Sequence, residues 1–116
     1  MLKQQRLINE NKNITFMTLA YIICKDAIEA EKISVRLLNK KLIACANIFP
    51  VRSMYRWKKK IVNEAENVII AKTNEKNFDK VVSEVKKIHS YQIPCVLKID
   101  SVANKEYDKW AEKEMR

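Results

Sequence analysis

The sequence predicts an α+β fold in which strands and helices follow the order β-α-β-β-α-β, with one more helix at the carboxyl end. Three observations support this order. A dense apolar run at residues 14–24 is typical of a strand buried on both faces. Residues 51–57 alternate between two sets of side chains, as in a strand with two different faces. Residues 26–40 and 74–89 repeat apolar side chains at helical spacing.

The folded part is expected to begin after a polar leader. Residues 1–13 lack the apolar segment of a secretory signal, and we expect them to be a flexible leader before a single domain of residues 14–116. The first strand is followed by Asp26, three residues before Glu29, which suits a helix N-cap with a capping-box partner. The helix is expected to end near Lys40, where a basic side chain suits the helix dipole.

The second strand, residues 42–57, is unusually long, since most strands have about 5–6 residues. Pro50 lies inside it and cannot donate a ladder hydrogen bond, which indicates an edge strand or a bulge there. Three lysines at residues 58–60 predict the turn, and residues 61–73 predict the returning strand.

The far end of this hairpin has Ser53, Tyr55 and Trp57 on one face. A hairpin of this length extends beyond the core that a chain of 116 residues can build. Two interpretations are open. The hairpin is either a long exposed edge of the sheet, or its far end packs against another subunit.

The remaining elements complete the fold. Residues 74–89 predict a second amphipathic helix, residues 93–99 a fourth strand and residues 104–115 a short terminal helix. Two crossovers in this order give a ferredoxin-like sandwich of four antiparallel strands with two helices on one face. Because the other face also carries apolar residues, we expect an oligomer to bury it.

Composition excludes several classes of protein. The chain has no glycine, which excludes glycine-rich phosphate-binding loops. No apolar run reaches the ~18 residues of a membrane span. Three cysteines do not make a disulfide framework, and their odd number indicates reduced thiols and an intracellular setting. Of the three, Cys45 lies between two alanines and is interpreted as part of the core.

The net charge of +9 permits anionic partners, but codon bias towards AT-rich DNA is the favoured explanation of the overall basicity. A basic hairpin tip beside Tyr55 and Trp57 is one possible nucleic-acid surface. Domains of this order that recognise RNA stack bases on aromatic residues of their central strands, and residues 61–73 have none. We therefore expect no nucleic-acid partner. No recognisable catalytic triad occurs either, and we do not expect an enzyme.

The candidate chemistry lies near the only histidine, His89, which precedes Cys95 by six residues. Histidine and cysteine are common ligands of soft metal ions, but a histidine at the end of a helix also suits the helix dipole. Cys24, at the end of the first strand, is a further ligand candidate. Glu64 and Glu66 lie on one face of the returning strand, either in cross-strand ion pairs or as a cation-binding pair.

These motifs together resemble a known family. The Ser-x-Tyr-x-Trp strand, a Lys-Thr pair before the second helix and a His-x-Tyr-x-x-Pro link occur in a specific order. The residues that carry the resemblance are Leu42, Ala44, Cys45, Asn47, Ile48, Ser53, Met54, Tyr55, Arg56, Trp57, Glu64, Lys72, Thr73, His89, Tyr91, Pro94, Tyr107 and Trp110. Residues 14–116 resemble the CutA divalent-cation tolerance proteins.

The resemblance implies a ferredoxin-like protomer in a compact homotrimer that is related in architecture to the nitrogen-regulatory PII proteins. It also implies a role in tolerance to copper and other divalent cations, copper binding by some members, and no established enzymatic activity. In such a trimer, strands of neighbouring subunits extend each other's sheets, which gives the long hairpin a purpose.

The resemblance further implies a metal site made by a thiol of the first strand, the histidine of the link and a glutamate after the proline. His89 matches, Cys95 replaces the glutamate, and Cys24 lies two residues beyond the matching first-strand position, Ile22. A cysteine in place of glutamate favours softer ions such as Cu(I) or Zn(II), or marks the loss of the site. His89, Cys95 and Cys24 are therefore the candidate metal ligands.

The leading prediction is a trimeric protein of divalent-metal, chiefly copper, homeostasis with self and a metal ion as partners. The alternative is a PII-like small-molecule sensor or signalling scaffold, with Lys72, Tyr91 and Glu64 as candidates for clefts between subunits. A structural anchor for another protein is a third class. The expected location is cytoplasmic, or an organelle if a targeting segment precedes or overlaps the leader.

Overall fold

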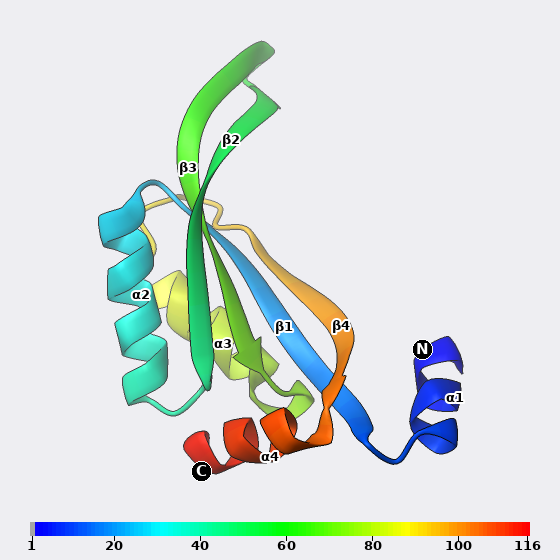
Figure 1. The fold of residues 1–116 in the computed structure, drawn as a ribbon. Coiled ribbons are helices and arrows are strands. Elements are labelled where there is room, and N and C mark those ends of the chain that lie inside the picture. The colour runs from blue at the N-terminus through cyan, green and yellow to red at the C-terminus, as the bar shows by residue number, and fades with distance from the viewer. Residues whose placement is uncertain (1) are drawn as a thin grey trace.

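A four-stranded antiparallel sheet with the strand order β2-β3-β1-β4 forms the centre of the molecule (Figure 1). The computed structural model describes residues 2–116. Its elements are α1 (Leu2–Glu10), β1 (Ile14–Cys24), α2 (Ala27–Asn39), β2 (Cys45–Trp57), β3 (Lys60–Thr73), α3 (Glu75–Ile88), β4 (Val96–Asn104) and α4 (Lys105–Glu114). The predicted ferredoxin-like sandwich with an additional carboxyl-terminal helix is confirmed.

The main core lies between the sheet and the layer of α2 and α3 (Figure 1). Alternate residues of β1 enter it because successive side chains of a strand point to opposite faces. Its fully buried members are Ala20, Ile22, Cys24, Ala30, Ile33, Leu37, Ile69, Ala71, Val81 and Val85. Burial of each larger aliphatic side chain contributes about 1.5–3 kcal/mol. The core therefore fixes the helix-facing side of the sheet.

Capping residues set the start of both helices in this layer. The Asp26 side chain accepts a hydrogen bond of 2.8 Å from the Glu29 N–H, which confirms the predicted N-cap of α2. Asn74 caps α3 in the same way through the Asn77 N–H, at 2.7 Å. The last residue of α2 is Asn39, one position before the predicted Lys40.

The β2–β3 hairpin pairs without interruption from Cys45↔Lys72 to Trp57↔Lys60. Pro50 therefore causes no bulge, and it is tolerated because β2 is an edge strand. Lys58 and Lys59 form the turn with φ of 49° and 68°, so β3 already begins at Lys60. The far end of the hairpin projects well beyond the helices (Figure 1).

Three expected strand boundaries differ from the structure by more than one residue. β2 begins at Cys45 rather than at residue 42, because the segment that precedes it completes the connection from α2. β4 covers Val96–Asn104 rather than residues 93–99. Its ladder with β1 starts only at the pair Ile22↔Val96, after Pro94, and continues past Asp100 and Ser101, which interrupt the apolar pattern.

Part of the expected leader is helical. α1 has no buried residue, and it is attached to the sheet edge by a hydrogen bond of 3.2 Å from Gln4 Nε2 to the Asp100 carbonyl. The mobility of residues 1–13 stays a prediction. Within residues 2–116, no helix is long and apolar enough to cross a membrane.

The sheet face opposite α2 and α3 is only partly covered. α4 packs on one end of it, where Met17 and Ala111 form a second buried cluster with Leu19 and Tyr107 against them. Sequence periodicity placed α4 but did not show this contact. Beyond α4 the face remains open, and Leu97 is 52% exposed.

Candidate functional site

A cleft of about 670 Å³ lies between the projecting half of the β2–β3 hairpin and the link between α3 and β4. Its lining residues are Ile23, Ser53, Met54, Tyr55, Trp57, Glu66, Ser90, Tyr91, Gln92, Ile93 and Cys95. The lining is mostly apolar and aromatic, and it contains one carboxylate and no lysine or arginine. A cleft without a basic residue is notable in a chain with a net charge of +9.

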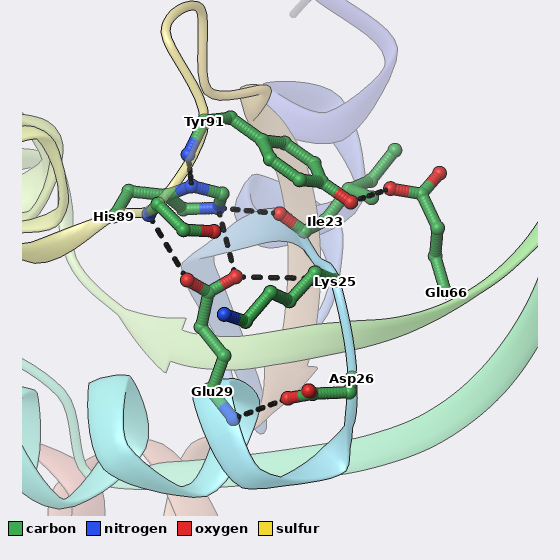
Figure 2. Close-up of polar contacts among 8 residues, drawn as sticks. Ile23, Lys25, Asp26, Glu29, Glu66, His89 and Tyr91 are labelled. Carbon is green, nitrogen blue, oxygen red and sulfur yellow. Dashed lines mark hydrogen bonds and ion pairs between the residues drawn. The ribbon is translucent and has the colours of Figure 1, made fainter.

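Two tyrosine–glutamate pairs lie along this cleft. The Tyr91 hydroxyl donates a hydrogen bond to Glu66 Oε2 (Figure 2), and the Tyr55 hydroxyl donates one of 2.5 Å to Glu64 Oε1. The bond to Glu64 raises the pKa of Tyr55 to about 12. Burial and the bond to Glu66 raise the pKa of Tyr91 as well. Both phenols are therefore neutral donors, and both carboxylates are acceptors.

Neither Glu64 nor Glu66 forms an ion pair within residues 2–116, so the cross-strand ion pairs considered for them are absent from this part of the chain. The nearby Arg52 instead donates a hydrogen bond of 3.0 Å to Asn63. Arg52 pairs with Ala65 in the ladder, so its side chain lies on the opposite face of the hairpin from Glu64 and Glu66.

A second polar group lies buried behind the cleft. Ligand-type atoms of Cys24, Glu29 and His89 all lie within 4.8 Å of one another. Cys24 ends β1, Glu29 lies in the first turn of α2, and His89 follows α3 as its C-cap. Three elements distant in sequence therefore meet at this buried point.

Both ring nitrogens of His89 are engaged by the backbone (Figure 2). Nδ1 accepts a hydrogen bond of 3.0 Å from the Tyr91 N–H, which requires a lone pair on that nitrogen. Nε2 lies 2.7 Å from the Ile23 carbonyl oxygen, so it carries the proton and donates it. The imidazole is thus held in one neutral tautomer, and its side chain is fully buried.

Glu29 is equally occupied. Oε1 accepts a hydrogen bond of 3.0 Å from the Lys25 N–H, and Oε2 accepts one of 3.0 Å from the Ser90 N–H. Burial alone would raise the pKa of the Glu29 carboxyl, but these hydrogen bonds outweigh it and the pKa is lowered. Cys24 behaves in the opposite way, because burial, followed by the nearby carboxylate of Glu29, raises the pKa of its thiol to about 12.

A metal ion does not fit this buried group as it stands. Each ligand must offer a lone pair. Here Nδ1 accepts the Tyr91 N–H and Nε2 donates to the Ile23 carbonyl, so neither ring nitrogen of His89 has a free lone pair. The group instead satisfies buried backbone donors and one carbonyl, which is a structural role.

The structure separates the three predicted metal ligands. It brings Cys24 and His89 together, with Glu29 as the third member that sequence reasoning had treated only as a capping residue. Cys95 pairs opposite Ile23 and lines the cleft, whereas the Cys24 side chain lies on the helix-facing side of the sheet. Whether any of the three binds metal stays a prediction.

The other predicted residues divide between the cleft and its surroundings. Ser53, Tyr55, Trp57 and Tyr91 line the cleft, and Glu64 is bonded to Tyr55 at its rim. Lys72 lies outside the lining, where it contacts Asn47 and, at 3.8 Å, Cys45 Sγ. The interpretation of Cys45 as a core residue is wrong, because its side chain is only partly buried on the face with Lys72.

The molecule is a small ferredoxin-like α+β protein with an open sheet face and a cleft beside its projecting hairpin. The model of the CutA1 divalent ion tolerance protein family matches residues 18–114, and the chain belongs to this family. The "Divalent-cation tolerance protein CutA" of Archaeoglobus fulgidus is 47% identical over 79 residues, which are 68% of this chain and 78% of that protein.

Solved structures agree with this assignment. The structure of the "periplasmic divalent cation tolerance protein CutA" of Archaeoglobus fulgidus has a TM-score of 0.82 and 38% identity, covering 88% of this chain and 100% of its own. CutA1 of Pyrococcus horikoshii has a TM-score of 0.83 and 34% identity, covering 86% of this chain and 99% of its own. The fold and the family therefore rest on sequence and structure alike.

Proposed function

We propose that this protein acts in divalent-cation tolerance by binding copper at the Cys95 thiol in the cleft. The observation that carries this proposal is the local chemistry of the cleft. A thiol and the Glu66 carboxylate, which is only 4% exposed, share it without any lysine or arginine in its lining. Thiolates favour soft ions such as Cu(I), and an uncompensated carboxylate favours cations generally.

Cys95 suits this role better than Cys24 does. Its side chain is partly exposed and lines the cleft, whereas Cys24 is fully buried in the core. Burial, together with the negative charge of Glu66, raises the pKa of the Cys95 thiol, so copper binding must release a proton. His89 and Cys24, the other ligands implied by the resemblance, are not part of the proposed site.

The proposal includes a homotrimer. β2 and β4 are the two edge strands of the sheet, and unpaired edges are templates for pairing with another chain. Trp57 and Leu97 are 45% and 52% exposed in the protomer. Exposed aromatic residues and open strand edges together favour assembly through the hairpin and the open sheet face.

A PII-like small-molecule sensor is the second candidate. The volume of the cleft, about 670 Å³, lies within the range of about 300–1,000 Å³ that is usual for ligand pockets. Its aromatic lining and few polar groups are also typical of such pockets. Neither candidate function includes a catalytic reaction.

Copper titration tests the leading proposal. Reduced, metal-free protein is titrated with Cu(I) and Cu(II) against a competing chelator, beside the Cys95→Ser and Cys45→Ser variants. We expect wild type and Cys45→Ser to bind copper and Cys95→Ser to lose at least tenfold in affinity. Undiminished binding by Cys95→Ser would remove the proposed site. Binding of small organic ligands without any copper effect would favour the sensor.

The free thiols also suggest a cellular location for the protein. All three cysteines are free. A copper site that depends on a reduced thiol suits a reducing compartment, and we propose the cytoplasm or an organelle with reduced glutathione. Fractionation of cells that express the full-length protein tests this location.

A further inference from the structure

We propose that His89 is a positioning residue and not a metal ligand: with Glu29 it fastens the link between α3 and β4 so that Tyr91 reaches Glu66. This inference concerns the cleft of the proposed function and rests on that function only for the identity of the ligand. It departs from the ligand set that the family resemblance implies. Figure 2 shows the residues involved.

The first step is the attachment of the link to β1. The fully buried imidazole donates from Nε2 to the Ile23 carbonyl oxygen at 2.7 Å. The next backbone contact is made by Cys95, whose carbonyl oxygen accepts a hydrogen bond of 3.3 Å from the Ile23 N–H. Ile23 therefore holds both ends of residues 89–95.

The second step is the attachment of the link to α2. Glu29 accepts the Ser90 N–H at Oε2 and the Lys25 N–H at Oε1, both at 3.0 Å. Its carboxylate lies 3.9 Å from His89 Nε2. Glu29 is itself fixed because its backbone N–H is bonded to Asp26. The link thus has anchors on a strand and on a helix.

The third step is the orientation of Tyr91. Its N–H donates to His89 Nδ1 at 3.0 Å, and the two rings lie with their centroids 4.9 Å apart. The Tyr91 side chain then extends to the opposite face of the sheet, where its hydroxyl bonds Glu66. A continuous series of contacts runs from Glu29 through His89 and Tyr91 to the Glu66 carboxylate in the cleft.

Metal coordination by His89 would dismantle this series. A metal on Nδ1 would displace the Tyr91 N–H, and a metal on Nε2 would leave the Ile23 carbonyl without its donor. Either change leaves a buried backbone group without a hydrogen-bond partner, which natural structures rarely tolerate. The positioning role and the ligand role are therefore mutually exclusive at this histidine.

The His89→Gln variant separates the positioning role of His89 from a role as metal ligand. In His89→Gln the side-chain amide retains one donor for Ile23 and one acceptor for Tyr91, but it is a poor ligand for copper. In His89→Ala both contacts are lost. Tyr91→Phe is the matched reference, because it removes only the bond to Glu66.

Nitrogen NMR of wild type is the primary measurement and needs no variant. We expect His89 to show a protonated Nε2 and an unprotonated Nδ1, with both signals unchanged after one equivalent of Cu(I). We also expect His89→Gln to keep wild-type Tyr91 ring shifts and copper affinity within threefold. His89→Ala should shift the Tyr91 ring signals towards a state without the Glu66 bond, for which the Glu66→Leu variant, which has no side-chain acceptor, is the reference.

Two results would overturn the inference. One is a copper-induced shift of either His89 nitrogen, and the other is loss of copper binding by His89→Gln with an unchanged Tyr91 environment. Failure of wild type to bind copper would refute the proposed function alone, because the tautomer and the Tyr91 shifts would still test the positioning role.

Discussion

Cys24 and Cys95 lie at the same end of two neighbouring strands but on opposite faces of the sheet. Cys24 is fully buried beneath α2 and α3, while Cys95, opposite Ile23, lines the cleft. The backbone of the sheet therefore lies between the two thiol side chains. This relationship decides which cysteine is available for chemistry in the native protein.

The first prediction concerns thiol reactivity. Because burial raises the pKa of Cys24 to about 12, its thiolate is almost absent at neutral pH. In native protein we expect a thiol reagent to modify Cys24 at least a hundredfold more slowly than Cys45 and Cys95. After denaturation we expect all three to react at similar rates. Mass spectrometry of peptides after timed labelling measures this, with Cys45→Ser and Cys95→Ser as controls. Rapid native labelling of Cys24 would contradict its placement.

The second prediction concerns the hairpin turn. Lys59 has a φ of 68°, in the left-handed region that costs a residue with a Cβ about 1–2 kcal/mol. Lys59→Gly removes this cost, although glycine loses more chain entropy on folding. Because the entropy loss is smaller than the cost removed, we expect the free energy of unfolding to rise by about 0.5–1 kcal/mol. Thermal unfolding measures the gain. Lys60→Gly is the matched control and should destabilise, because Lys60 belongs to β3.

The third prediction concerns acid stability. Glu84, whose side chain is 7% exposed, accepts a hydrogen bond of 2.7 Å from Arg36 and lies 3.4 Å from both Lys40 and Lys87. The Arg36 hydrogen bond, followed by those from the lysines, lowers the pKa of Glu84. A lowered pKa in the folded state contributes stability that is present above the unfolded pKa of about 4.3 and is lost as pH falls.

Glu84→Gln should therefore lower the melting temperature at pH 7, and the difference from wild type should disappear in strong acid. Melting curves between pH 7 and pH 2 measure both effects. Glu31→Gln, on the exposed side of α2, is the control and should change little at any pH. A deficit of Glu84→Gln that grows as the pH falls would refute the role of the ion pairs.

The fourth prediction concerns assembly. We expect light scattering to give a mass of three times the 13.7 kDa of the chain. Trp57 is 45% exposed in the protomer and would be buried only in the proposed interface. Trp57→Ala should therefore weaken the trimer, because truncation of a buried aromatic typically costs about 3–5 kcal/mol. Ile61→Ala, at another exposed position of the hairpin, is the comparison variant. A wild-type mass near 13.7 kDa, or an unchanged melting temperature of the Trp57→Ala trimer, would count against this placement.

Local patterns predicted most of the fold. Three features can be recognised from a few residues of sequence: the apolar run of β1, the alternation in β2 and the Asp26 cap. They depend on the periodicity of apolar residues and on capping chemistry, which are both local. The second half of β4 is harder to recognise, because Asp100 and Ser101 interrupt its apolar pattern while the strand continues to pair with β1. Its end was therefore placed five residues too early.

The candidate site was less predictable. Glu29 reads as an ordinary capping residue, and its contact with the Ser90 N–H joins residues 61 positions apart in sequence. No pattern within a few neighbouring residues of the sequence indicates such a contact. Residue types singled out His89 and Cys95, but only the register of β1 with the link shows that their side chains serve different faces.

The hairpin has one further property. Thirteen consecutive pairs join β2 to β3 without a bulge, so the ribbon has no built-in joint between its tip and its base. Glu66 and Tyr55 both belong to this ribbon and both lie along the cleft. Trp57 is itself a lining residue of the cleft. In the proposed trimer, a subunit that packs on Trp57 would therefore also cover part of the cleft, and assembly and ligand binding would share one surface.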